Sequence, residues 1–243
     1  MAENGQVHIG TSGWHYDHWK KNFYPEGVNN GAMLDYYAEK LDSVEINNAF
    51  YRLPEKKTFR AWAGKVPRDF IFSVKASRYI THMKKLRTVK RPVNKVLNTV
   101  KALGGKLGPI LFQLPPRWKK NTSRLEHFLS LLPEENRYAF EFRDPSWFSD
   151  DVYDALREKN AAFCIYHLAG RMSPKILTGD FAYIRLHGPK GAYKGRYTGG
   201  DLAGWAGAIS AWRRNGNDVY CYFDNDQKGY AAENAVELHG MTG

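Results

Sequence analysis

Short apolar runs rich in β-branched and aromatic residues alternate along this chain with longer segments of helical periodicity. Eight of the short runs predict strands, at residues 7–12, 43–48, 70–76, 109–114, 138–143, 162–168, 181–187 and 219–224. Seven of the longer segments predict helices, near residues 32–41, 56–65, 91–104, 122–132, 150–158, 200–214 and 231–239. The stretch 169–180 lacks helical periodicity, so we expect an irregular connection between the sixth and seventh strands.

The alternation continues without a linker, a repeat or a low-complexity segment, which predicts one α/β domain over residues 1–243. This length and order suit a single (β/α)8 barrel of the TIM type. A doubly wound open sheet is the alternative. No Gly-x-Gly-x-x-Gly turn follows the first strand, so the sequence favours the barrel.

Polar residues occupy alternate positions in several predicted strands, although the strands of a parallel barrel are normally apolar throughout. A period of two places them on one side of each strand, which we expect to be the barrel interior. Most fall late in their strands, toward the end of the barrel where TIM-type enzymes have their active sites. The set comprises Glu45, Asn47, Ser73, Lys75, Gln113, Glu141, Arg143, Arg185, His187, Tyr222 and Asp224.

Charged groups inside a barrel must pair, contact a ligand or meet water, because an unpaired buried charge is strongly destabilising. One interpretation is a purely structural layer of ion pairs, with Glu45 and Glu141 against Lys75, Arg143 and Arg185. The other is a functional pocket. So many ionisable groups, from at least six strands, exceed what a barrel needs for stability, so we favour the pocket.

A series of short motifs runs in a fixed order along almost the whole chain. They are Thr11-Ser12-Gly13-Trp14, Val44-Glu45-Ile46-Asn47, Phe72-Ser73-Val74-Lys75, Phe112-Gln113-Leu114-Pro115-Pro116, Phe140-Glu141-Phe142-Arg143, Tyr183-Ile184-Arg185-Leu186-His187-Gly188 and Tyr222-Phe223-Asp224-Asn225-Asp226. This series resembles the YecE-like family, a domain of unknown function. The resemblance implies a TIM-type barrel and supplies no settled activity.

The net charge of +11 marks a basic protein, and the charge is concentrated in the first half of the chain. Residues 1–120 hold 22 Lys and Arg against 9 Asp and Glu, whereas residues 121–243 hold 14 against 16. This asymmetry predicts one electropositive surface. The expected partner is therefore an anion, either a small ligand or a nucleic acid.

Three loops add candidates for ligand binding. The loop 188–197 is rich in glycine and carries Lys190 and Arg196, which suits a phosphate site after the seventh strand, unless the loop is merely solvated. The aromatic loop that begins at Trp14 is either a packed cap or a stacking platform. The basic run between residues 78 and 95 is either a solvated face or a contact for a nucleic acid backbone.

The leading functional hypothesis is an enzyme that acts on a phosphate-bearing or otherwise anionic substrate, with a hydrolase as the candidate class. In it Glu141 is the general acid and base, Glu45 assists, and His187 is a second proton-transfer candidate. The expected substrate contacts are Asn47, Lys75, Gln113, Arg143, Arg185, Tyr222, Asp224, Lys190, Arg196 and Trp14.

Two further classes of function stay open: a non-catalytic nucleic-acid-binding protein, and a carbohydrate-active protein that depends on aromatic side chains. A divalent metal is compatible with the carboxylates, but few histidines fall at strand ends, so we assign no metal site. The N-terminus lacks the features of a secretory signal and no apolar run is long enough to span a membrane, so we expect a cytoplasmic protein. Cys164 and Cys221 fall in apolar runs and are expected to be buried thiols.

Overall fold

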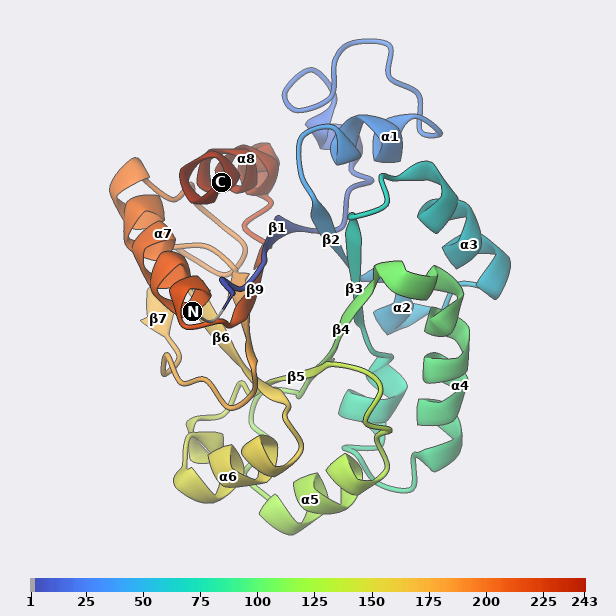
Figure 1. Cartoon of the computed structure of the whole chain (residues 1–243), viewed down its shortest axis with the longest axis vertical. Coiled ribbons are helices and arrows are strands. Elements are labelled where there is room, and N and C mark those ends of the chain that lie inside the picture. The colour runs from blue at the N-terminus through green and yellow to red at the C-terminus, as the bar shows by residue number, and fades with distance from the viewer. Residues whose placement is uncertain (1–2) are drawn as a thin grey trace.

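Eight parallel strands close into a barrel surrounded by helices in the computed structural model, which describes residues 3–243 (Figure 1). The strands are β1 (Val7–Ser12), β2 (Ser43–Ile46), β3 (Ile71–Lys75), β4 (Leu107–Gln113), β5 (Tyr138–Glu141), β6 (Ala162–Leu168), β8 (Phe181–Leu186) and β9 (Asp218–Phe223). Each is hydrogen-bonded to its two neighbours in the order β5-β4-β3-β2-β1-β9-β8-β6. Pairing of β5 with β6, with Ala139 opposite Ala162, closes the ring and excludes the open sheet.

The helices follow the predicted order around the barrel. They are α1 (Met33–Ala38), α2 (Asn48–Tyr51), α3 (Lys56–Lys65), α4 (Lys90–Val100), α5 (Thr122–Ser130), α6 (Asp150–Glu158), α7 (Gly199–Arg214) and α8 (Tyr230–Thr242). The seven predicted helices are all present, and α2 is an additional single turn directly after β2. Asn121 and Thr198 cap α5 and α7 with their side-chain oxygens, which accept from backbone N–H groups.

The connection between β6 and β8 contains no helix, as the sequence predicted. Its only regular element is the two-residue strand β7 (Arg171–Met172), which pairs antiparallel with the end of β6. This hairpin lies at the C-terminal end of the barrel strands and therefore borders the expected site. None of the helices within residues 3–243 is long and apolar enough to cross a membrane.

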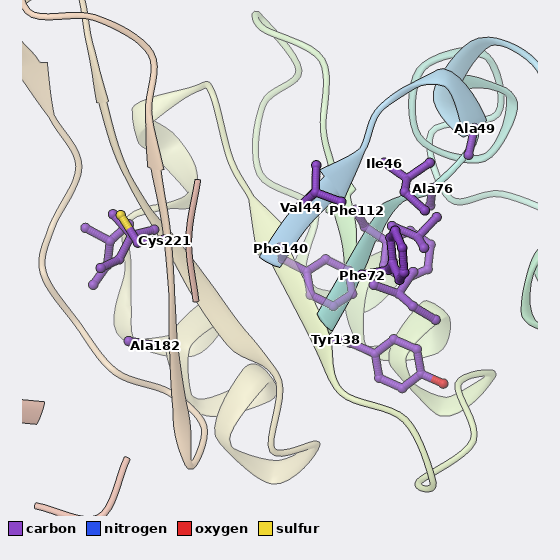
Figure 2. Close-up of a cluster of buried hydrophobic side chains, with 14 of the residues drawn as sticks. Val44, Ile46, Ala49, Phe72, Ala76, Phe112, Tyr138, Phe140, Ala182 and Cys221 are labelled. Atoms are coloured by element: carbon purple, nitrogen blue, oxygen red, sulfur yellow. The ribbon is translucent and has the colours of Figure 1, made fainter. Parts of the chain in front are cut away.

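Alternate strand residues build two separate apolar layers. Phe112 and Phe140 are among the outward side chains (Figure 2), and their rings stack with centres 5.3 Å apart. Phe112 also meets Phe128 of α5 edge to face. A smaller inward cluster fills the lower barrel and includes Tyr183, Tyr222 and Cys164. Both cysteines are free and buried, as expected.

Polarity increases along the barrel interior toward the C-terminal ends of the strands. The Tyr222 hydroxyl lies 2.7 Å from Ser43 Oγ and donates to Ser73 Oγ at 3.0 Å, which makes a neutral hydrogen-bonded layer above the apolar one. The next inward position of β2 is Glu45. The charged residues predicted to face inward therefore lie on top of a closed, packed barrel floor.

Candidate functional site at the C-terminal ends of the strands

Arg185 lies at the centre of the charged layer, between carboxylates from two other strands. Its Nη2 donates to Glu45 Oε1 and its Nη1 donates to Glu141 Oε2, each at 2.7 Å. Ser12 Oγ and Tyr183 Oη also donate to Glu45, at 2.8 and 2.7 Å. Because Arg185, Glu45 and Glu141 are all fully buried, these ion pairs lie below the solvent-accessible surface.

Glu141 also accepts a hydrogen bond from a second guanidinium group, because Arg143 Nε donates to Glu141 Oε1. Burial alone would raise the pKa of Glu141, but the charges of Arg143 and Arg185 hold that pKa well below its ordinary value. A lowered pKa favours the ionised carboxylate, which suits a general base better than a general acid. Glu141 also positions two arginines by accepting hydrogen bonds from both.

His187 and Asp224 form a buried pair next to these arginines. The distance from His187 Nδ1 to Asp224 Oδ2 is 2.9 Å, and His187 Nε2 lies 3.0 Å from Arg143 Nη2. An arginine can only donate, so in the contact with Arg143, His187 Nε2 is the acceptor, and Nδ1 is then the donor to Asp224. Burial would raise the pKa of Asp224, but the hydrogen bond from His187 and the charge of Arg185 lower it overall.

Lys75 is an unpaired cation at the end of β3. Its Nζ lies 4.4 Å from the centre of the Phe50 ring, and among residues 3–243 no carboxylate forms an ion pair with it. Burial, followed by the charge of Arg185, lowers the pKa of Lys75 to about 8. An ammonium group held at this position without a carboxylate partner is available for an anion.

A cleft of about 590 Å³ opens at the C-terminal ends of β4, β5 and β6. Arg143 forms part of its wall and stacks over the Tyr166 ring, with its guanidinium carbon 5.0 Å from the ring centre. Gln113 contributes a buried amide whose Oε1 has no hydrogen-bond partner within the described chain. The cleft therefore offers a cation, an unsatisfied amide and aromatic surfaces; its remaining lining includes Phe148, Arg171, Met172 and Tyr193.

Tyr193 closes the cleft over the buried histidine. Its backbone N–H donates to the His187 carbonyl at 2.6 Å, and the two rings meet edge to face with centres 5.5 Å apart. His187 therefore lies beneath two residues that line the cleft, Arg143 and Tyr193. Sequence reasoning placed Tyr193 in a candidate loop but selected only the cations of that loop.

Several predicted contacts lie elsewhere. Tyr222 belongs to the neutral layer below Glu45 and cannot reach the cleft. Trp14 and Asn47 line a second cleft, of about 420 Å³, beside Trp62 at the ends of β1 and β2. The Asn47 Oδ1 atom is buried there without a partner among the described residues.

The predicted phosphate loop after β8 does not bring its cations to the barrel mouth. Arg196 Nε lies 3.6 Å from Glu233 and Arg196 Nη2 lies 3.7 Å from Glu237, so this arginine packs against α8. Lys190 is exposed to solvent. Arg196 therefore faces two carboxylates of α8 in this structure, and its role as a substrate contact stays a prediction.

The sequence analysis did not select most of the residues that line the cleft, among them Tyr166, Arg171 and Met172. Tyr166 had a readable signal, because it is a polar aromatic residue late in a predicted strand. Arg171 and Met172 form β7, which is too short to produce a hydrophobic pattern. Over residues 3–243, the structure brings no three His, Cys, Asp or Glu side chains together as a metal site.

The fold and this end of the barrel define the class of the protein: a (β/α)8 barrel with a cationic, aromatic-lined cleft at the C-terminal ends of its strands. A family model described as "Protein of unknown function DUF72" matches residues 8–243, and the chain belongs to this family. The UPF0759 protein YunF of Bacillus subtilis (strain 168) is 25% identical over 271 residues, which cover 96% of this chain and 93% of YunF.

Solved structures of the same family have the same fold. A DUF72 family protein of Thermotoga maritima MSB8 superposes with a TM-score of 0.88 at 28% identity, covering 97% of this chain and 98% of that one. A DUF72 family protein of Enterococcus faecalis V583 gives a TM-score of 0.83 at 19% identity, covering 98% and 95%. The family thus supports the barrel but supplies no activity.

Proposed function

We propose that this protein is an enzyme that binds a small anionic substrate, such as a phosphate ester, in the cleft beside Arg143. The observation that carries the proposal is the position of Arg143. Glu141 accepts from its Nε and His187 Nε2 lies 3.0 Å from its Nη2, while Arg143 also forms part of the cleft wall. A guanidinium group anchored in this way is well suited to bind a phosphate or carboxylate through paired hydrogen bonds.

Two features of the cleft suggest what the substrate carries besides its anionic group. Tyr166 and Tyr193 supply ring surfaces for an apolar or planar part of the ligand. The unpartnered Gln113 Oε1 calls for a donor such as a hydroxyl or amino group. Lys75 supplies a second positive charge at the same end of the barrel.

His187 is the best-placed group for proton transfer. Its Nε2 lies 3.0 Å from Arg143 Nη2, so an anion that takes over the Nη2 hydrogen bond would leave the Nε2 lone pair free while Nε stays on Glu141. His187 would then accept a proton from a substrate hydroxyl or from water, and Asp224 would stabilise the imidazolium ion through Nδ1. Glu45 and Glu141 hold the arginines during this step.

The experiment is a thermal-shift screen of inorganic phosphate, sugar phosphates and nucleotides, repeated with two variants. A true ligand at about one hundred times its Kd should stabilise the wild type by about 2.7 kcal/mol. Arg143→Gln should abolish that shift, whereas Arg196→Gln should retain it because Arg196 packs against α8. A shift that survives Arg143→Gln would contradict the proposal.

A carbohydrate-active function is the second candidate, because of the cleft beside Trp14. Trp14 and Trp62 meet edge to face there, with ring centres 5.0 Å apart, and the buried Asn47 Oδ1 lacks a partner in the described chain. Aromatic rings and amides are typical of sugar-binding sites. A neutral sugar whose binding is insensitive to salt and lost in Trp62→Ala would favour this function.

The narrower assignment within the family, to the YecE-like proteins, rests on the ordered motifs of the sequence.

A further inference from the structure

A basic surface follows β3, and none of its residues lines the cleft of the proposed substrate. Residues 70–125 hold 14 Lys and Arg and no Asp or Glu. Seven of these cations lie in the β3–α4 connection and the start of α4, and all seven are exposed. We call this surface the basic flank; its cations are Arg78, Lys84, Lys85, Arg87, Lys90, Arg91 and Lys95.

The cations of the basic flank are not neutralised by the fold. None of the seven takes part in an ion pair within residues 3–243, whereas Lys101, Lys119 and Lys120 farther along the same acid-free stretch pair with Glu135, Asp144 and Asp151. Like charges gathered on one surface repel each other and attract polyanions. These unpaired cations therefore do not stabilise the fold.

The start of α4 strengthens the positive potential of the basic flank. This helix of 11 residues begins at Lys90, has no acidic residue in its first turn and has no side-chain cap from Val89. The amino end of a helix already carries a partial positive charge, so Lys90 and Arg91 are unfavourably placed for the isolated protein. A bound phosphate group would reverse the sign of that effect.

An exposed aromatic ring lies among these charges. Tyr79 is 40% exposed, and Lys84 Nζ lies 5.6 Å from the centre of its ring. Tyr79 and Arg91 border two clefts, one of about 440 Å³ toward Leu53 and one of about 770 Å³ toward His127 of α5. An exposed ring that borders two hollows suits an unstacked base, and the surrounding cations suit the phosphates of its backbone.

We propose that the basic flank binds single-stranded nucleic acid, with Tyr79 stacking on a base and the seven cations contacting the backbone. A single strand fits better than a duplex, because only an unpaired base can enter the clefts beside Tyr79. This surface does not include Arg143 or any other residue that lines the cleft of the proposed substrate. The two proposals can therefore be tested with different variants.

The first test is the fluorescence anisotropy of a labelled oligothymidylate and of the same strand annealed to oligoadenylate, titrated with the full chain. The affinity for the single strand should fall steeply between about 50 and 200 mM salt. In the triple variant Lys84→Glu, Lys85→Glu, Arg87→Glu the salt slope should fall by about 2, or about 0.7 for each cation removed. The matched control, Lys20→Glu, Lys40→Glu, Arg214→Glu, reverses three exposed charges elsewhere and should keep most of the affinity.

The second test separates nucleic acid from polyanions in general. Tyr79→Ala should weaken oligothymidylate binding about tenfold, Tyr79→Phe should restore it, and neither change should affect binding of inorganic polyphosphate. Equal losses in the two triple variants, or a Tyr79→Ala variant that binds the oligonucleotide as tightly as wild type, would overturn the proposal. Circular dichroism of each variant establishes that it is folded. If the triple variant keeps the thermal shift with phosphate esters, its loss of oligonucleotide binding does not come from a change in the substrate cleft.

Discussion

Arg185 Nη2 donates to Glu45 Oε1 across the barrel interior, at 2.7 Å between two fully buried side chains. The two residues lie on β8 and β2, which are not neighbours, because β9 and β1 separate them in the sheet. The contact therefore ties opposite parts of the ring together. It also fixes the layer on which Arg143 and His187 rest.

Replacing Arg185 with methionine should strongly destabilise the protein. The variant leaves Glu45 without its guanidinium partner and removes one of the two guanidinium groups that hold Glu141, so we expect a loss of about 3–5 kcal/mol in the free energy of unfolding. Urea denaturation followed by circular dichroism measures it. Arg196→Met, at a half-exposed arginine, is the control and should cost at most about 1 kcal/mol. A loss as small as that in Arg185→Met would show that the central arginine is dispensable for the fold.

Stability should decline in acid as Glu141 becomes protonated. Its pKa in the folded protein lies well below the value of 4.5 for a free side chain, so the folded state binds this proton less readily than the unfolded state. Above about pH 4.5 the ionised Glu141 makes its full contribution to the free energy of unfolding. That contribution is lost as the pH falls through the pKa of Glu141 in the folded protein. Unfolding free energies between pH 7 and pH 3 should show this decline, and Glu141→Gln should be less stable at pH 7 but decline less steeply. Parallel curves for the two proteins would contradict the assignment.

The sequence predicted the barrel and the charged interior well, because both depend on local periodicity. Glu45, Glu141 and Arg185 alternate with apolar neighbours, and that alternation alone places them inside. Which cation meets which carboxylate could not be predicted, because contacts across a barrel depend on strand tilt and stagger. Lys75 is the example: it alternates in the same way as Arg185 but forms no ion pair within residues 3–243.

Gln113 should lower the stability of the protein, although its side chain provides a hydrogen-bond acceptor for a ligand in the cleft. Its buried Oε1 has no partner among the described residues, so Gln113→Leu removes an unsatisfied polar atom and should raise the free energy of unfolding by about 1 kcal/mol. The same change should weaken binding of any ligand found in the thermal-shift screen, because the donor on the ligand loses its acceptor. Thermal unfolding with and without ligand measures both effects. A variant that is less stable than wild type would indicate that the amide already has a partner.

Lys75 should make the free energy of unfolding depend on pH in the alkaline range. Burial and the charge of Arg185 lower its pKa from 10.5 to about 8, so the folded state binds fewer protons than the unfolded state between these two values. The free energy of unfolding therefore gains from this group as pH rises from about 8 to 10.5. Buried tyrosines also titrate at high pH, so the measurement is the difference between wild type and Lys75→Met at each pH. Lys75→Met should be the more stable protein at pH 7, with an advantage that shrinks toward pH 10. An advantage independent of pH would mean that Lys75 keeps an ordinary pKa, and that the ammonium group offered to an anionic substrate is fully hydrated.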